Sequence, residues 1–219
     1  MLQLIEKNRI IFIFYFLVLI SFTAILAIMG KMDMHLWLTG FHSHFTDSIM
    51  QLITFLGDGL FMVLTGILLL FRRLRYGLII LSSFVINSVM VQLLKRLIFT
   101  HDKRPVSWFH DMGIEIYRIP GVEYHSFFSF PSGHSATAFA LFFGLAFFVK
   151  TSWLKFLLVF FAVVTAYSRV YLSQHFLGDA LAGSIIGLTI AVFFQLISGK
   201  INRVWIDESI ITLLRKKNV

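Results

Sequence analysis

Cysteine is absent from this chain of 219 residues, which excludes a fold held together by disulfides. Charge is also scarce, because the 19 Lys and Arg and the 11 Asp and Glu residues make up only 14% of the chain. Soluble domains contain about 25% charged residues. Apolar residues account for 58% of the chain. A soluble domain of this length would have too few polar residues to cover so much apolar material. A disordered protein would have a far lower apolar fraction. The composition therefore predicts an integral membrane protein.

The net charge of +8 does not indicate a nucleic-acid-binding protein. Such a protein presents a basic patch on a soluble module, whereas the basic residues of this chain stand between long apolar runs. We therefore expect no nucleic-acid partner. We expect the chain to be embedded in the lipid bilayer.

Six apolar stretches can cross a bilayer core of about 30 Å, which takes about 20 helical residues. Polar residues interrupt three of them: Asp58 between two glycines, His134, and the pair Ser168–Arg169. Ionisable residues at membrane depth are costly and mark functional sites. Because no linker or repeat divides the chain, we predict one all-α domain over residues 1–219, a six-helix polytopic membrane protein. The predicted spans are 10–29, 50–71, 76–94, 131–149, 154–171 and 179–198.

The distribution of Lys and Arg predicts the orientation, because these residues concentrate on cytoplasmic loops. With the N-terminus inside, seven of the 19 lie on the outer side, namely Lys31, Lys95, Arg96, Lys103, Arg104, Arg118 and Arg169. We therefore expect both termini in the cytoplasm. The run 10–29 exceeds the roughly 7–15 apolar residues of a signal peptide, so we interpret it as an uncleaved anchor. A bacterial inner (plasma) membrane is the expected location.

Three polar segments meet on the outer side of this topology. The first runs from Lys95 to Arg104–Pro105, the second is Pro131-Ser132-Gly133-His134, and the third joins Ser168–Arg169 to His175 and Asp179. Arg and Lys bind phosphate oxygens. A Pro-Ser-Gly helix start offers free backbone N–H groups to an anion. The outer face therefore has the components of a phosphate site.

Two histidines provide the candidate catalytic groups of this site. His175 and Asp179 are four residues apart, so on a helix they share one face. A carboxylate on one imidazole nitrogen leaves the other nitrogen free to attack phosphorus. A second histidine, His134, can supply the proton that a leaving alkoxide needs. The pattern predicts phosphoryl transfer without a metal or another cofactor.

At these residues the sequence resembles the type 2 phosphatidic acid phosphatase family, which is related to acid phosphatases and vanadium haloperoxidases. The family motif Pro-Ser-Gly-His matches at 131–134, and Ser-Arg-x5-His-x3-Asp matches from Ser168 to Asp179. The resemblance implies that His175 forms a phosphohistidine, that Asp179 orients it and that His134 is the general acid. It implies that the phosphate oxygens are bound by Lys95, Arg104, Ser132, Gly133 and Arg169.

The first family motif, Lys-x6-Arg-Pro, fits only at Arg104–Pro105. The position seven residues before Arg104 is Leu97, whereas Lys95 is nine residues before it, so this chain has two extra residues. We assign Lys95 to the lysine role, with Arg96 and Lys103 as the alternatives.

The family resemblance implies a lipid phosphatase, and its substrate remains open among undecaprenyl diphosphate, phosphatidylglycerol phosphate, phosphatidic acid and lipid A phosphates. We keep two alternative functions. One is a lipid phosphotransferase, in which an alcohol replaces water, and the other is an anion-binding membrane transporter.

His35, His42 and His44 lack carboxylates at metal-ligand spacing, so we expect surface histidines there and no metal site. The sequence does not predict an oligomeric state.

Overall fold

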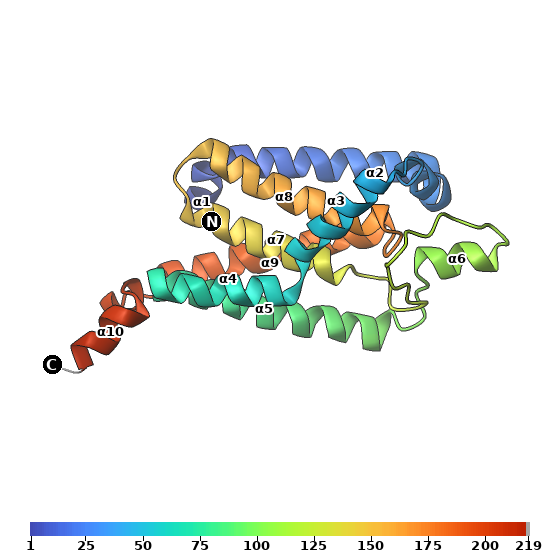
Figure 1. The fold of residues 1–219 in the computed structure, drawn as a ribbon. Helices are drawn as coiled ribbons and strands as arrows, with labels where there is room; N and C mark the ends of the chain where they lie inside the picture. The colour runs from blue at the N-terminus through green and yellow to red at the C-terminus, as the bar shows by residue number, and fades with distance from the viewer. Residues whose placement is uncertain (218–219) are drawn as a thin grey trace.

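The computed structural model describes residues 1–217, and within that range it is helical and contains no strand (Figure 1). The α-helices are α1 (Leu2–Lys7), α2 (Arg9–Leu38), α3 (His44–Thr54), α4 (Gly59–Arg72), α5 (Leu74–Leu93), α6 (Pro105–Asp111), α7 (Gly133–Phe148), α8 (Ser152–Tyr171), α9 (Leu177–Lys200) and α10 (Ile210–Lys217). Short turns of other helix types are η1 (Phe55–Gly57), the π-helical turn η2 (Leu94–Ile98) and η3 (Val204–Asp207).

The prediction of an all-α membrane protein is confirmed for the described residues. Four helices are long and apolar enough to cross a membrane, namely α2, α5 with its continuation η2, α8 and α9. A fifth candidate span is the pair α3–η1 and α4, which passes the same criterion only as a unit bent by 53°. The remaining predicted span, 131–149, corresponds to α7, an apolar helix that is shorter than these. The count of six spans stays a prediction.

Two predicted spans differ in shape from simple helices. The first continues beyond residue 29, because α2 passes through a break at Gly30, with φ of 79°, and ends at Leu38. The second breaks at the Gly57-Asp58-Gly59 sequence, where Asp58 becomes the N-cap of α4 and accepts a hydrogen bond from Leu60 N at 2.7 Å. A carboxylate that caps the N-terminus of a helix satisfies free N–H groups, which explains this polar interruption.

The centre of the bundle is α7, which is apolar around its whole circumference and accordingly buried. It packs closely on α9 through Gly183 and Gly187. A Cβ atom at either glycine would overlap the backbone of α7, at Ser132 O and Ala136 O respectively. Small residues four apart let two membrane helices approach closely. This contact fixes the start of α7 beside the start of α9.

The segment 99–130 and α6 lie at one end of the bundle, and both termini lie at the opposite end (Figure 1). Backbone hydrogen bonds hold the segment in place, from Arg104 N to Ser126 O at 2.9 Å and from Ser129 N to Asp102 O at 3.0 Å. The three sequence motifs lie at this same end of the bundle, next to the segment.

Candidate active site

The third motif lies where α8 ends and α9 begins. His175 is in the turn between these helices, not on a shared helix with Asp179 as the four-residue spacing predicted. The two side chains are nevertheless adjacent, with His175 Nδ1 3.5 Å from Asp179 Oδ2. The Asp179 carboxylate folds back over the helix start, where Oδ2 accepts hydrogen bonds from Phe176 N at 2.9 Å and Ser129 Oγ at 2.5 Å. Asp179 is therefore fixed beside one imidazole nitrogen.

His175 is only 2% exposed and is surrounded by positive charge. Burial and the charges of Arg104, Lys95 and Arg169 lower the pKa of its imidazole well below the usual value. The ring is therefore neutral near pH 7, and its unprotonated nitrogen has the lone pair that a nucleophile needs.

The second motif begins α7, as its sequence predicted. Gly133 is the first helical residue, and Ser132 is the N-cap, whose side chain accepts hydrogen bonds from Ser135 N at 3.4 Å and Ser135 Oγ at 2.9 Å. Ser132 is fully buried and does not line the cavity described below. Its backbone N donates to Asp179 O at 3.0 Å, which joins the second motif to the third. The structure therefore brings Gly133 and His134 to the cavity, and it places Ser132 behind them.

The three candidates for the lysine role in the first motif lie in different places in the structure. Lys95 is buried in the π-helical turn η2 and donates from Nζ to Phe128 O at 2.8 Å, at the edge of the cavity. Arg96, the next residue, is exposed and does not line this cavity. Lys103 forms an ion pair with Asp111 on the surface. Of the three candidates for the lysine role, Lys95 is thus the one that reaches the cavity.

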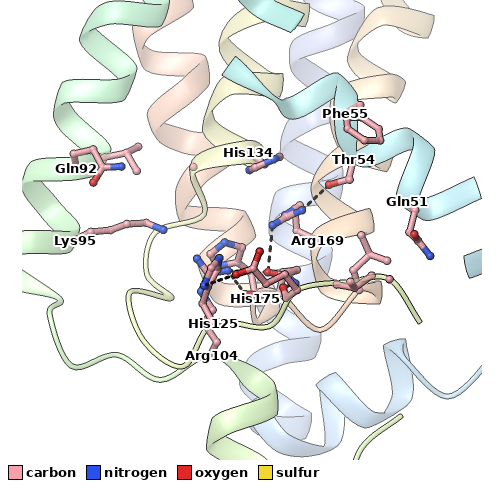
Figure 2. Close-up of a pocket in the computed structure, with 17 residues that line it drawn as sticks. Gln51, Thr54, Phe55, Gln92, Lys95, Arg104, His125, His134, Arg169 and His175 are labelled. Atoms are coloured by element: carbon pink, nitrogen blue, oxygen red, sulfur yellow. Dashed lines mark hydrogen bonds and ion pairs between the residues drawn. The ribbon is translucent and has the colours of Figure 1, made fainter. Parts of the chain in front are cut away.

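One cavity of about 440 Å³ collects most of the predicted site residues, which reach it from different elements (Figure 2). Those at its lining are Lys95, Arg104, Gly133, His134, Arg169 and His175, while Asp179 lies behind His175. Glu123, an exposed residue, is the one carboxylate among the described lining residues. One lysine and two arginines against one exposed carboxylate make this a cavity for an anion.

Neutral oxygens, not carboxylates, hold the arginines of the cavity. Arg169 Nη1 donates to Thr54 Oγ1 at 2.7 Å, and Arg104 Nη1 donates to Gln174 Oε1 at 2.9 Å. The same Gln174 oxygen accepts from Arg169 Nη2 at 3.5 Å, and Gln174 Nε2 donates to Glu123 O at 2.6 Å. The positive charge of the guanidinium groups is therefore left available to a ligand.

Sequence reasoning missed Thr54 and Gln174. Gln174 immediately precedes His175, so its position in the motif was the one available signal. Thr54 belongs to the bent α3–α4 pair, and no local pattern relates it to Arg169. Asp58 lies at the same bend with Oδ2 4.0 Å from His134 Nε2. Asp58 caps the start of α4 and is not among the lining residues of the cavity.

The histidine group near the end of α2 differs in part from expectation. His35 is buried, not on the surface, and its Nε2 lies 3.2 Å from Ser173 Oγ. His42 Nδ1 lies 3.0 Å from Asp47 Oδ1, and His44 is exposed. Across residues 1–217 no three His, Asp or Glu side chains are grouped so as to hold a metal ion.

Comparison with known proteins relates this arrangement to a family. A family model described as the PAP2 superfamily matches residues 60–203. Over 60 residues the chain is 42% identical to a lipid A 4'-phosphatase of Bacteroides thetaiotaomicron, which is 27% of each protein. The match thus spans about a quarter of the length of that curated relative.

Two crystal structures have the same fold. The LpxE protein of Aquifex aeolicus is 21% identical with a TM-score of 0.65, covering 76% of this chain and 94% of that one. The PAP2-type phosphatidylglycerolphosphate phosphatase of Bacillus subtilis is 24% identical with a TM-score of 0.65, covering 90% of this chain and 98% of that one. The family match extends from α4 to the end of α9 and includes all three motifs. This helical membrane protein therefore belongs to the PAP2 superfamily, as its motifs predicted.

Proposed function

We propose that this protein is a membrane phosphatase that hydrolyses a phosphate monoester or diphosphate of a lipid through a phosphohistidine on His175, without a metal. One observation supports this most directly: a buried His175, with the Asp179 carboxylate 3.5 Å from its Nδ1, lines a cavity with one lysine and two arginines. An anion-binding transporter needs the cations but has no use for an oriented nucleophile. The names of the relatives, which include phosphatases of lipid A and of phosphatidylglycerolphosphate, support the same reaction class.

The proposed reaction has two steps. Asp179 favours the tautomer with the proton on Nδ1, so His175 Nε2 attacks phosphorus and a new N–P bond replaces the P–O bond to the leaving group. His134 protonates the leaving oxygen. Water then attacks the phosphohistidine, His134 takes up its proton, and inorganic phosphate is released.

The cations act on the charge of the transferred group. Lys95, Arg104 and Arg169 surround the phosphate oxygens, and the free N–H groups at the start of α7, beginning with Gly133, face the same anion. Ser132 contributes indirectly, because its side chain caps α7 and its backbone joins α7 to Asp179. Such preorganised charges supply most of the catalysis in phosphoryl transfer.

We further infer that residues 1–219 act as one domain in the inner (plasma) membrane and that the site faces the outer side. The position of both termini at the end opposite the motifs supports this orientation (Figure 1), as does the concentration of Lys and Arg near the ends of the chain. A lipid phosphate then reaches the site with its headgroup at the interface and its tails in the bilayer.

The test is phosphate release by the purified protein in detergent, with undecaprenyl diphosphate, phosphatidylglycerol phosphate, phosphatidic acid and lipid A as substrates. We expect release by the wild type and almost none by His175→Ala. The matched control is His110→Ala, which removes an exposed histidine of α6.

A chelator should leave the activity intact, and loss of activity with the chelator would contradict the metal-free mechanism. Transfer of phosphate to an added alcohol without hydrolysis would identify a phosphotransferase, whereas anion binding without turnover would identify a binding or transport protein.

A further inference from the structure

A second cavity adjoins the catalytic one and has no role in the reaction as described so far. This cavity, which we call the annex, is lined by Arg96, Thr100 and residues 126–128, and its volume is about 660 Å³. It shares Gln92, Lys95, Arg104 and His125 with the catalytic cavity. Lys95 and Arg104 therefore stand between two spaces that lie side by side.

The annex is strongly basic. Its described lining includes one lysine, two arginines and His125, and it includes no aspartate or glutamate. The cations shared with the catalytic cavity are held by carbonyl groups, with Lys95 Nζ 2.8 Å from Phe128 O and Arg104 Nε 3.1 Å from Phe127 O. A carbonyl does not neutralise a charge, so the annex attracts a second anion.

The annex has a cation of its own, Arg96 in the π-helical turn η2. A π-turn accommodates extra residues in a helix, and this chain has two more residues between Lys95 and Arg104 than the family motif. The consecutive residues Lys95 and Arg96 lie in different surroundings. Lys95 is buried and lines both cavities, whereas Arg96 is exposed and lines the annex but not the catalytic cavity. Arg96 thus adds a positive charge to the annex and not to the catalytic cavity.

We propose that the annex is a second phosphate subsite, specific for a phosphate joined directly to the one that is cleaved, so that the favoured substrate is a lipid diphosphate. This inference rests on the proposed phosphatase function. Because Lys95 and Arg104 border both spaces, they can contact two phosphates that share a bridging oxygen. Arg96 then contacts only the phosphate that remains on the lipid.

Cleavage of a diphosphate at this site forms one bond and breaks one bond in each step. His175 attacks the terminal phosphorus, the bond from that phosphorus to the bridging oxygen breaks, and its electron pair stays on the bridging oxygen. That oxygen belongs to the phosphate in the annex, where Arg96 and Arg104 stabilise the negative charge. Water then releases the terminal phosphate from His175, so the products are inorganic phosphate and a lipid monophosphate.

The surroundings of the annex suit a lipid substrate. Phe127 and Phe128 line it and are 43% and 44% exposed, and the neighbouring Leu97 and Ile98 are also exposed on η2. Exposed apolar residues beside a cationic cavity are typical of a place where a headgroup enters protein while its chain remains in the bilayer.

The test compares farnesyl diphosphate with farnesyl monophosphate, which differ only in the second phosphate. We expect Arg96→Gln in the full-length protein to lower the ratio of kcat/KM for the diphosphate to kcat/KM for the monophosphate by roughly tenfold, the effect of one lost charge-assisted contact. Arg96→Lys, which keeps the charge, should restore most of the ratio. Lys103→Gln, which removes a cation paired with Asp111, is the matched control and should leave the ratio at its wild-type value.

The outcomes separate this inference from the proposed function. An unchanged ratio in folded Arg96→Gln would overturn the annex assignment while leaving the phosphatase intact. A loss on phosphatidylglycerol phosphate but not on farnesyl diphosphate would also overturn it, because the second phosphate of that lipid is a diester set apart by glycerol. Absence of phosphate release from every substrate by folded wild-type protein would instead contradict the proposed function.

Discussion

The guanidinium of Arg169 on α8 donates from Nη1 to the hydroxyl of Thr54 at the end of α3, over 2.7 Å. Arg169 is 9% exposed, and its Nε atom has no hydrogen-bond partner within the described part of the chain. A buried arginine depends strongly on the few partners it has. The bent α3–α4 pair, which contributes no family motif, therefore takes part in orienting the cation that we propose binds phosphate.

Replacement of Thr54 by valine should weaken the site without unfolding it. Valine keeps the shape and removes the acceptor, so Arg169 loses its orientation, and we expect kcat/KM for phosphate release to fall roughly tenfold. Thr54→Ser retains the hydroxyl and should stay near the wild type. Equal losses in both variants would assign Thr54 a packing role instead.

Gln174→Leu should affect substrate binding. The side-chain amide joins Arg104 and Arg169 to the carbonyl of Glu123, so its removal frees two like charges from a common acceptor. We expect KM to rise about fivefold to tenfold, the effect of one or two lost hydrogen bonds, with a smaller change in kcat. Gln174→Glu should be more damaging, because a carboxylate would neutralise the arginines and repel phosphate. Steady-state kinetics of the two variants measure this order.

The pH dependence of the enzyme should reflect the environment of His175. Because burial and three neighbouring cations lower the pKa of His175, the ring stays neutral as the pH falls through 6.5, the usual value for histidine. We expect the acid limb of kcat/KM to lie below pH 6.5. A limb at or above that pH would contradict the prediction. Two substrates with different phosphate pKa values provide the control, since a limb that moves with the substrate belongs to the substrate.

The choice of Lys95 for the lysine role makes a direct comparison possible. Lys95 lines the catalytic cavity, whereas Lys103 pairs with Asp111 on the surface. Replacement of Lys95 by alanine should lower kcat/KM by about a hundredfold or more, and replacement of Lys103 by alanine should change it less than twofold. The reverse order would show that Lys103 binds the phosphate.

The absence of cysteine makes the orientation measurable with single introduced cysteines. A cysteine at Asp111, at the end of α6, should react with an impermeant thiol reagent in intact cells. A cysteine at Lys150, between α7 and α8, should react only after the membrane is permeabilised. Labelling in the opposite order would place the motifs on the cytoplasmic side.

Much of the fold was predictable because composition and long apolar runs report directly on the membrane. The ends of α5, α8 and α9 lie within a few residues of the predicted spans. Asp58 between two glycines was noted as a polar interruption, but the span 50–71 was predicted as one helix and the bend there was not. The continuation of α2 past Gly30 was not, because the helix continues where the apolar run ends. The short α6 was not predicted either, since seven residues give too little periodicity to recognise.

Part of the candidate site was likewise predictable from the sequence, and part of it was not. Residues with a defined spacing in a motif, such as His175 and Asp179, were predicted as neighbours, although the geometry that joins them is a helix start and not a helix face. The choice between Lys95 and Arg96 depended on a π-turn, which sequence spacing does not reveal. Thr54 lies more than a hundred residues from Arg169 along the chain. Such partners are fixed by tertiary packing and leave no local signal.

The contact of α9 with α7 at Gly183 and Gly187 has a consequence for the chemistry itself. These glycines set how closely the two helices approach, and each helix begins beside one of the two histidines proposed to act on the phosphate. The separation of His134 and His175 is therefore set at positions inside the helix bundle that do not line the cavity. A single added methyl group there would move α7 away from α9, and with them the two histidines, while every residue of the site kept its identity.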